Sequence, residues 1–255
     1  MKITLNRITP QKNTITTTAL VFLFGCGVFA PEAEAQTSPS FTYLSNSAKA
    51  KTTRYWDCCK ASGAFDGKAE VNAPVKACAR DGKTPVDAAT QSICSGGTGF
   101  TCTSNQPWPV NKKLSYGFAA ASLAGKSESD TSCACYELKF TSGSVKGKTF
   151  VAQVINSTMS SDPDSNHFSL MIPGGGVGIF NGCQSQWNAP SEGWGARYGG
   201  VSNSSQCSQL PAELRQGCNW RFGWFKNAKN PNTTFRRVKC PTELIAKSGC
   251  TRKDE

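Results

Sequence analysis

The sequence predicts an all-β fold, a barrel with long disulfide-linked loops and a few short helices. Short runs rich in β-forming residues recur along the chain, and Gly, Pro, Ser and Asn separate them. The chain also contains 13 cysteines in 255 residues, which indicates a disulfide framework. Its length fits one domain, because barrels and sandwiches of this size are common.

Residues 1–35 are predicted to be a signal peptide. Basic residues precede an apolar run over 19–30, which is too short to span a bilayer, and an A-x-A cleavage site ends at Ala35. No later segment is apolar enough for a membrane span, so we expect a secreted protein. Residues 36–51 are rich in Ser, Thr and Ala and predict a disordered lead-in to a single domain over 52–255.

Cys26 lies in the predicted signal peptide, so twelve cysteines remain, which fits six disulfides in an oxidising compartment. They are Cys58, Cys59, Cys78, Cys94, Cys102, Cys133, Cys135, Cys183, Cys207, Cys218, Cys240 and Cys250. Cys58 and Cys59 are adjacent and cannot easily pair with each other, so each is expected to bind a different part of the fold. Zinc is disfavoured, since His167 is the sole histidine and the cysteine spacing is not that of a zinc site.

Strands are predicted at 114–119, 136–141, 149–155, 167–172, 177–180 and 234–238. Short helices are predicted at 85–92, 211–216 and 242–247, the last two from a leading Pro and a following Gly. The glycine-rich run 173–178 lacks the Lys-Ser/Thr ending of a phosphate-binding loop, so close backbone packing or a cleft wall is expected there instead.

The formal net charge of +11 is compatible with binding to nucleic acid or to acidic polysaccharides, and also with a solvated basic surface. Charged residues are scattered singly apart from two short basic pairs, and no nucleic-acid motif accompanies them. A solvated basic surface is therefore favoured over binding to nucleic acid or to acidic wall polymers such as pectin.

The segment 53–60, Thr-Arg-Tyr-Trp-Asp-Cys-Cys-Lys, carries the main functional signal. It places one carboxylate, Asp57, between two aromatic residues and two cysteines. Tyr55 and Trp56 are candidates for stacking on sugar rings, although adjacent residues of a strand face opposite sides and one of the two is expected to pack in the barrel. The alternative is an ordinary surface aspartate in a disulfide-rich strand.

Residues 52–60 resemble the signature of glycoside hydrolase family 45, the small fungal-type endoglucanases, and the similarity extends from Thr52 to Cys250. Further matching blocks are Pro107-Trp108, 117–120, 133–138, 165–168, 173–180, 197–200 and 220–222. The resemblance implies a six-stranded double-psi β-barrel with a long open groove, inverting hydrolysis of internal β-1,4-glucosidic bonds, and no metal or cofactor. It implies a monomer that acts on cellulose, xyloglucan or mixed-linkage glucan.

An inverting glycosidase needs two carboxyl groups, a general base and a general acid. The resemblance assigns the base to Asp57. The family's acid ends a Ser-Asn-His-Phe-Asp motif, but this chain reads Ser-Asn-His-Phe-Ser and places Ser169 there. A serine hydroxyl is too weak an acid to protonate a glycosidic oxygen by itself. Asp162 matches a third family acid and, with Asp164, is an alternative donor.

Three more residues are expected near the substrate. The resemblance places His167 beside the acid position, which favours hydrogen bonding in the cleft. Arg54 and Lys60 are expected to orient backbone or carboxylate groups at the site. The family also has a pair of bridged cysteines where this chain has Gly63 and Ser132.

The predicted function is a secreted endo-β-1,4-glucanase weakened by loss of its usual acid. Two alternatives are a non-hydrolytic, expansin-like protein that binds and loosens glucan, and an inactive effector that keeps only the scaffold. Ser169 favours the alternatives, whereas Asp57 and Asp162 favour hydrolysis.

Overall fold

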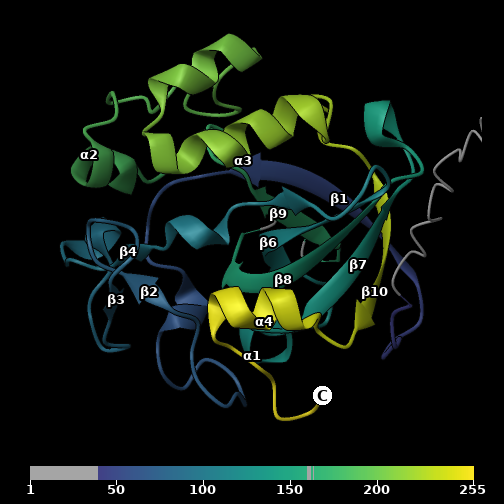
Figure 1. The fold of residues 1–255 in the computed structure, drawn as a ribbon. Helices are drawn as coiled ribbons and strands as arrows, with labels where there is room; N and C mark the ends of the chain where they lie inside the picture. The colour runs from purple at the N-terminus through teal and green to yellow at the C-terminus, as the bar shows by residue number, and fades with distance from the viewer. Residues whose placement is uncertain (1–39, 160–161, 163) are drawn as a thin grey trace, which may run out of the picture. The chain divides into compact units, whose positions relative to one another are not determined.

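The computed structural model describes residues 40–159, 162 and 164–255, so the predicted signal peptide lies outside the described residues (Figure 1). The strands are β1 (Ala48–Tyr55), β2 (Ala77–Cys78), β3 (Pro85–Val86), β4 (Phe100–Thr101), β5 (Trp108–Pro109), β6 (Leu114–Ser122), β7 (Cys135–Phe140), β8 (Thr149–Ser157), β9 (His167–Met171) and β10 (Thr233–Val238). The α-helices are α1 (Glu128–Thr131), α2 (Gly182–Trp187), α3 (Ala212–Gly223) and α4 (Thr242–Ser248). Within these ranges no helix is both long and apolar enough to cross a bilayer.

Six strands form a closed barrel. Their order is β6-β8-β7-β10-β1-β9, and β9 pairs back with β6. The pairs β1–β9 and β6–β8 are parallel, and the other pairs are antiparallel. A separate three-stranded sheet, β3-β2-β4, lies to the left of the barrel in Figure 1. The predicted fold, an all-β six-stranded double-psi barrel with few short helices, is confirmed.

Strand β6 is buried on both sides within the fold. Both of its faces are buried, because alternate side chains enter two different hydrophobic clusters. Leu114, Tyr116 and Phe118 belong to one cluster, and Ala119 and Ala121 belong to the other. The pairing register between β6 and β8 shifts at a bulge between Ala119 and Ala120. A bulge bends its strand and re-aims the following side chains, and this one lies opposite β9.

Helix α3 covers one side of the barrel, above it in Figure 1. Its Trp220 packs on Phe150 of β8 with ring centroids 5.5 Å apart. The helix was expected to stop before Gly217 but continues to Gly223. A Cβ atom at Gly217 would lie 2.6 Å from a ring carbon of Pro173, so this glycine allows close packing rather than ending the helix.

Several predicted boundaries are wrong. Residues 177–180 form a loop rather than a strand, and the predicted helix at 85–92 is strand β3 followed by a turn. Strand β1 begins at Ala48, within the predicted lead-in, because residues 48–50 pair with β10. The pairing partner lies almost 190 residues away, so no local pattern could reveal it.

Six disulfides join the twelve predicted cysteines. The bonds are Cys58–Cys183, Cys59–Cys94, Cys78–Cys102, Cys133–Cys250, Cys135–Cys240 and Cys207–Cys218. The two adjacent cysteines bind different segments, as predicted. Gly63 and Ser132 also lie together, since a Cβ atom at Gly63 would approach Ser132 Oγ to 2.6 Å. The two sites of the absent bridge are therefore neighbours in space.

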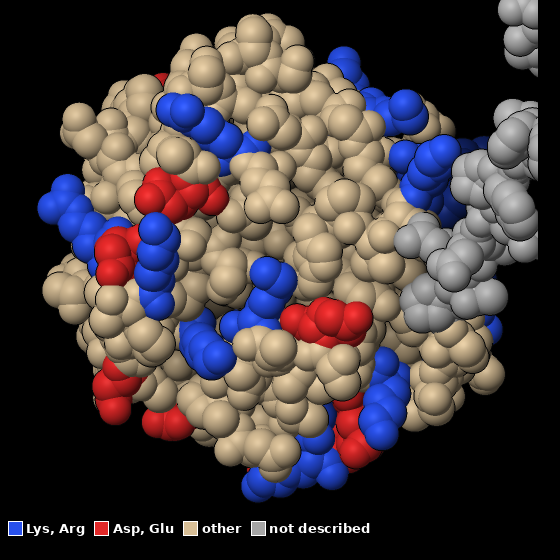
Figure 2. Space-filling model, viewed as in Figure 1, with Lys and Arg blue, Asp and Glu red and all other residues tan. Residues whose placement is uncertain are grey.

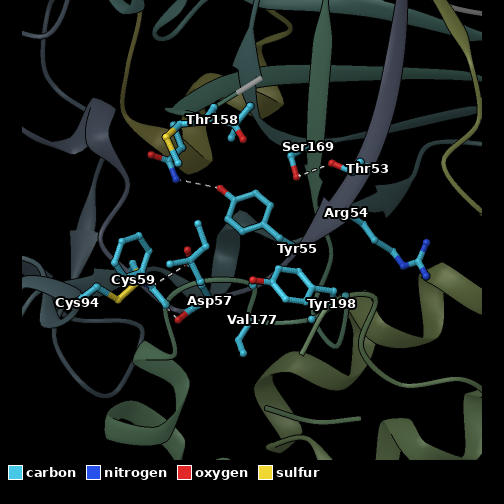
Figure 3. Close-up of a pocket in the computed structure, with 18 of the residues that line it drawn as sticks. Thr53, Arg54, Tyr55, Asp57, Cys59, Cys94, Thr158, Ser169, Val177 and Tyr198 are labelled. Carbon is cyan, nitrogen blue, oxygen red and sulfur yellow. Dashed lines mark hydrogen bonds between the residues drawn. A yellow bond between two sulfur atoms is a disulfide. The ribbon is translucent and has the colours of Figure 1, made fainter. Parts of the chain in front are cut away.

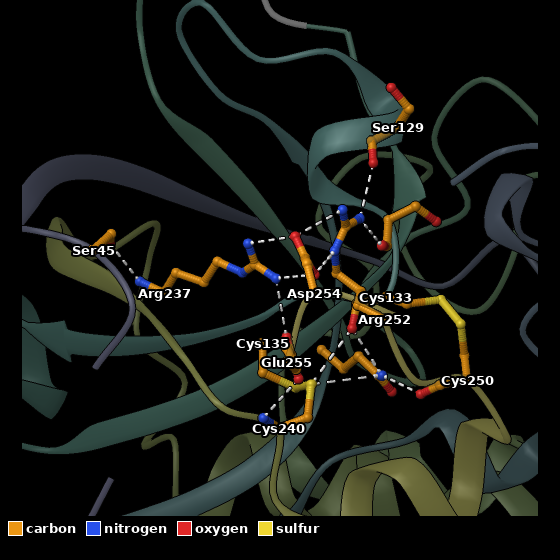
Figure 4. Close-up of polar contacts among 12 residues, drawn as sticks. Ser45, Ser129, Cys133, Cys135, Arg237, Cys240, Cys250, Arg252, Asp254 and Glu255 are labelled. Atoms are coloured by element: carbon orange, nitrogen blue, oxygen red, sulfur yellow. Dashed lines mark hydrogen bonds and ion pairs between the residues drawn. A yellow bond between two sulfur atoms is a disulfide. The ribbon is translucent and has the colours of Figure 1, made fainter. Parts of the chain in front are cut away.

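The C-terminal segment is held by a network of ion pairs (Figure 4). Asp254 lies between two arginines, 2.7 Å from Arg237 Nη2 and 2.8 Å from Arg252 Nε. Arg252 also donates to the carbonyl oxygens of Ser129 and Ser132, at 2.8 and 3.0 Å. The two guanidinium groups hold the pKa of Asp254 well below its usual range. This network binds the end of the chain to the segment that precedes β7.

Basic and acidic side chains are dispersed on the face shown in Figure 2, and several opposite charges touch each other. Among the described residues, Arg197 and Glu192 form an ion pair with two contacts of 2.9 Å. This face carries no continuous basic field of the kind that a nucleic-acid surface requires.

Candidate active site

An open cleft of about 870 Å³ crosses one end of the barrel. Its walls come from the end of β1, from β9, from the glycine-rich loop after β9 and from the loop that carries Tyr198 (Figure 3). Ligands commonly bind in clefts of this size, which have apolar walls and a few polar groups. The predicted residues Arg54, Tyr55, Asp57, Lys60 and Ser169 all line the cleft.

Strand β1 and the two residues that follow it divide their side chains between the cleft and the core. Thr53, Arg54, Tyr55 and Asp57 line the cleft, whereas Trp56 is only 2% exposed and belongs to the hydrophobic core. Tyr55 and Trp56 are adjacent, and adjacent residues of an extended chain point to opposite sides. Of the two aromatics predicted to stack on sugar, Tyr55 therefore reaches the cleft, and the substrate-binding assignment of Trp56 is wrong.

Asp57 is fixed by the backbone that surrounds it. Its Oδ1 accepts the N–H of Cys59 at 3.0 Å, and the two following residues are both anchored by disulfides. Cys58 adopts φ 63°, which turns the chain sharply after the carboxylate. Burial raises the pKa of Asp57 to about 7, and the hydrogen bond from Cys59 offsets part of that effect. The side chain is therefore a stronger base than an exposed aspartate.

The glycine-rich loop forms one wall of the cleft, as the sequence predicts. Trp56 N–H donates to Gly176 O at 2.8 Å, which ties the loop to the residue before Asp57. Gly176 has φ 101°, and a Cβ atom there would lie 2.6 Å from Arg197 O. Only glycine allows this approach of the two loops.

Ser169 occupies the wall that faces Thr53. The residue is 7% exposed, and it pairs with Thr53 of β1 on one side and with Ala120 of β6 on the other. Thr53 Oγ1 donates to Ser169 Oγ at 3.0 Å. The ring of Tyr55 lies between Ser169 and Asp57 in Figure 3. Among the described residues that line the cleft, Asp57 is the only carboxylate.

Asp162 and Asp164 lie on an exposed loop before β9. Asp162 Oδ1 accepts the N–H of Asp164 at 3.1 Å, and Asp162 O accepts the N–H of Ser165 at 3.1 Å. Neither carboxylate is among the described residues that line the cleft. Residues 160, 161 and 163 of this loop lie outside the described part of the chain.

His167 lies directly behind the cleft wall. Its Nε2 is 2.8 Å from Thr53 Oγ1, and the residue is half-buried. Burial, reinforced by nearby Lys51, lowers the pKa of His167. His167 is not among the described residues that line the cleft, and its contact with the cleft is through Thr53, so direct hydrogen bonding to substrate stays a prediction.

Tyr55 accepts a hydrogen bond from Asn156 Nδ2 at 3.1 Å. Burial raises the pKa of Tyr55, and the neighbouring Asp57 adds to the effect. The phenol stays neutral at physiological pH and presents a fixed ring edge beside the carboxylate.

Arg54 and Lys60 orient backbone, as expected. Arg54 Nε and Nη2 both donate to Gly199 O at 3.3 Å, next to Tyr198. Lys60 Nζ donates to Ala88 O and Thr90 O at 2.6 and 2.8 Å. The same ammonium lies 3.8 Å from the ring centroid of Phe65, so it also holds this aromatic at the cleft edge.

The sequence analysis missed the exposed apolar side chains of the cleft. Tyr198 is 72% exposed, and Met159, Ile179 and Phe180 are also exposed along the same cleft. Tyr198 belongs to the quoted block 197–200, but nothing in that block distinguishes a cleft tyrosine from a core one. Large exposed aromatics on an open groove are suited to stacking on sugar rings.

The described residues contain no group of three or more His, Cys, Asp or Glu side chains that could hold a metal ion. The half-buried carboxylate of Asp57, with its raised pKa, suits the cleft to acid–base chemistry.

Comparison with known proteins gives consistent matches. The family description "Glycosyl hydrolase family 45" matches residues 49–251. An endoglucanase of Cryptopygus antarcticus is 58% identical over 201 residues, which cover 79% of this chain and 88% of the relative. A putative endoglucanase type K of Fusarium oxysporum is 47% identical over 210 residues, which cover 82% of this chain and 55% of the relative.

A solved structure agrees with these matches. The crystal structure of the cellulase from the Antarctic springtail Cryptopygus antarcticus superposes with a TM-score of 0.79 at 56% identity. The alignment covers 82% of this chain and all of that one.

Proposed function

The chain belongs to glycosyl hydrolase family 45 and is an endoglucanase, and on this premise we propose that Asp57 is the general base of an inverting reaction on internal β-1,4-glucosidic bonds. One observation carries the proposal: among the described residues that line the open cleft, Asp57 is the only carboxylate, and this half-buried group, with its pKa raised to about 7, stands on a doubly anchored backbone. A base with a pKa near the working pH removes a proton from water most effectively.

Protonation of the leaving oxygen, the task of the general acid, is expected to be weak in this protein. Inverting enzymes protonate the leaving oxygen with a second carboxyl group about 6.5–9.5 Å from the first. The position that the family resemblance assigns to that acid holds Ser169, whose hydroxyl cannot act alone. Asp162 stays a predicted substitute, supported by its place in sequence. General-acid assistance is typically worth about 10²–10⁴-fold, so we propose a slower endoglucanase than one with both carboxyl groups.

We propose cellulose, xyloglucan or mixed-linkage glucan as the substrate and a secreted monomer as the working form. The open cleft admits an internal segment of a chain, and six disulfides suit an oxidising compartment. The named endoglucanases among the relatives do not favour the expansin-like or inactive alternatives. Incubation with each glucan tests the proposal: endo-cleavage lowers viscosity before much reducing sugar appears, and a purely binding protein changes neither.

Replacement of Tyr198 by alanine is expected to raise KM for a soluble glucan about tenfold with little effect on kcat. An exposed aromatic contributes about 0.5–1.5 kcal/mol by stacking, and 1.4 kcal/mol corresponds to tenfold in affinity. The matched control is Tyr43→Ala, which removes a 43% exposed tyrosine that does not line the cleft. Equal effects of the two substitutions would contradict a sugar-binding role for Tyr198.

The pH–rate profile should follow the ionisation of Asp57. A general base acts only when ionised, so kcat/KM should fall about tenfold per pH unit below about pH 7 and level off above it. A dinitrophenyl cello-oligosaccharide shows this limb alone, because its leaving group departs without a proton. A profile that is flat down to pH 5 on this substrate would exclude Asp57 as a base with a raised pKa.

A further inference from the structure

The proposed function requires a proton for the leaving oxygen, and three side chains in and directly behind the cleft wall point to its source. We propose that His167 supplies this proton through the hydroxyl groups of Thr53 and Ser169. The inference rests on the proposed function, since the relay acts only when Asp57 activates water on the other side of the bond.

The hydrogen bonds run in one direction. Thr53 Oγ1 donates its only proton to Ser169 Oγ at 3.0 Å, so the contact of 2.8 Å between Thr53 and His167 requires Nε2 to be the donor. Ser169 then keeps its own proton for an acceptor in the cleft, because no side chain among the described residues accepts it. Thr53 therefore accepts a hydrogen bond from His167 and donates one to Ser169, and the Ser169 hydroxyl can donate to a group in the cleft.

The strand register explains why the three side chains meet. Strands β1 and β9 are parallel. Lys51 is paired with His167, and two residues further along both strands Thr53 is paired with Ser169. Residues two apart on a strand share a face, so His167 and Ser169 both point toward Thr53. Ser169 opens onto the cleft, whereas His167 is half-buried behind it.

The surroundings of His167 suit a proton donor rather than a permanent cation. Lys51 faces the ring from β1, and the uncharged Ser122 is paired with it from β6. Burial and Lys51 both lower the pKa of His167, so its imidazolium releases a proton more readily than that of an exposed histidine. The neutral ring that remains is the form favoured by burial.

The proton balance of the step is complete. Water transfers a proton to Asp57 while its oxygen bonds to the anomeric carbon, and the bond from that carbon to the leaving oxygen breaks with its electron pair on oxygen. The leaving oxygen takes the proton of Ser169, which takes that of Thr53, which takes the Nε2 proton of His167. Solvent then reprotonates His167 and removes the proton from Asp57.

Other donors near the cleft are less suited. The Tyr55 hydroxyl accepts a hydrogen bond from Asn156, and its raised pKa makes it a weaker acid than an ordinary tyrosine. Lys60 Nζ is held by two backbone carbonyls and by the ring of Phe65. Asp162 is another competitor, and the experiment distinguishes it.

The test compares two substrates, cellohexaose and 2,4-dinitrophenyl β-cellotrioside, in the mature protein and in Thr53→Val, His167→Asn and Ser169→Ala. Only cellohexaose needs a proton donor. Each substitution should lower kcat on cellohexaose about 10²-fold or more and leave dinitrophenyl release unchanged. Thr52→Val is the matched control, because the neighbouring threonine bonds Pro231 O outside the relay; it should not change the ratio of the two rates.

The outcomes separate the alternatives. Equal losses on both substrates would show a structural role and overturn the relay. Insensitivity of cellohexaose cleavage to Thr53→Val, with loss in Asp162→Asn, would assign the proton to the loop acid. A protein that cleaves only the dinitrophenyl substrate would retain its base and lack any relay. If Asp57→Asn leaves dinitrophenyl release intact, the proposed function itself fails. When Ser169→Asp is already present, the aspartate donates the proton directly, so adding His167→Asn should not change the rate on cellohexaose.

Discussion

Replacement of Ser169 by aspartate is expected to raise kcat on unactivated glucan by about 10²-fold or more. The substitution restores a carboxyl group at the position that the resemblance assigns to the general acid, and such assistance is typically worth about 10²–10⁴-fold. The serine position is 7% exposed on the cleft wall, beside the small Ala120, so a carboxyl group there would face the cleft.

The control for this gain is Ser169→Asn, which has the size of aspartate but no acidic proton. It should not raise kcat on glucan, and neither substitution should change release of dinitrophenol from the activated substrate. Steady-state rates on carboxymethyl-cellulose and on the activated glycoside provide the measurement. A gain with asparagine as large as that with aspartate would mean that shape rather than acidity limits the wild-type protein.

Replacement of Asp57 by asparagine is expected to lower kcat by about 10²–10⁴-fold on both substrates, because the base is needed whatever the leaving group. Asparagine keeps the oxygen that accepts Cys59 N–H, so the local backbone should be preserved. Residual activity close to that of the wild type would remove Asp57 from the mechanism.

The same substitution should stabilise the fold at neutral pH. The carboxyl group has an ordinary pKa of about 3.9 in an unfolded chain and about 7 in the folded protein. Its contribution to the free energy of unfolding therefore decreases as pH rises from about 4 to about 7. Asp57→Asn should melt a few degrees higher than the wild type at pH 8 and at the same temperature at pH 4, since 1 kcal/mol corresponds to about 2–4 °C in a chain of this size. Loss of activity with gain of stability would exclude unfolding as its cause.

The barrel could be predicted because most of its strands are local patterns. The β-rich runs at 114–119, 136–141, 149–155, 167–172 and 234–238 all became strands. The run 177–180 is equally apolar, but its residues face the cleft and pair with no neighbouring strand. Composition cannot distinguish a buried strand from an apolar cleft wall.

The site could be predicted only in part. Period-two alternation indicated that one of Tyr55 and Trp56 must turn inward, but not which one, since that depends on where the barrel core lies. The hydrogen bonds that join Thr53, Ser169 and His167 depend on the register of two parallel strands more than 100 residues apart in sequence. Tyr198 was missed because exposure is a property of the folded loop.

The most direct test of the central claim is a leaving-group series. The claim is that Asp57 works as an intact base opposite a site from which the carboxyl acid has been replaced by Ser169. The measurement is kcat/KM for aryl β-cellotriosides whose phenols span a wide range of pKa, in the wild type and in Ser169→Asp. The account predicts that the wild-type rate falls steeply as the phenol becomes less acidic and that aspartate flattens the dependence. Equally shallow dependences in the two proteins would contradict it, because they would mean that the wild type already protonates its leaving group fully.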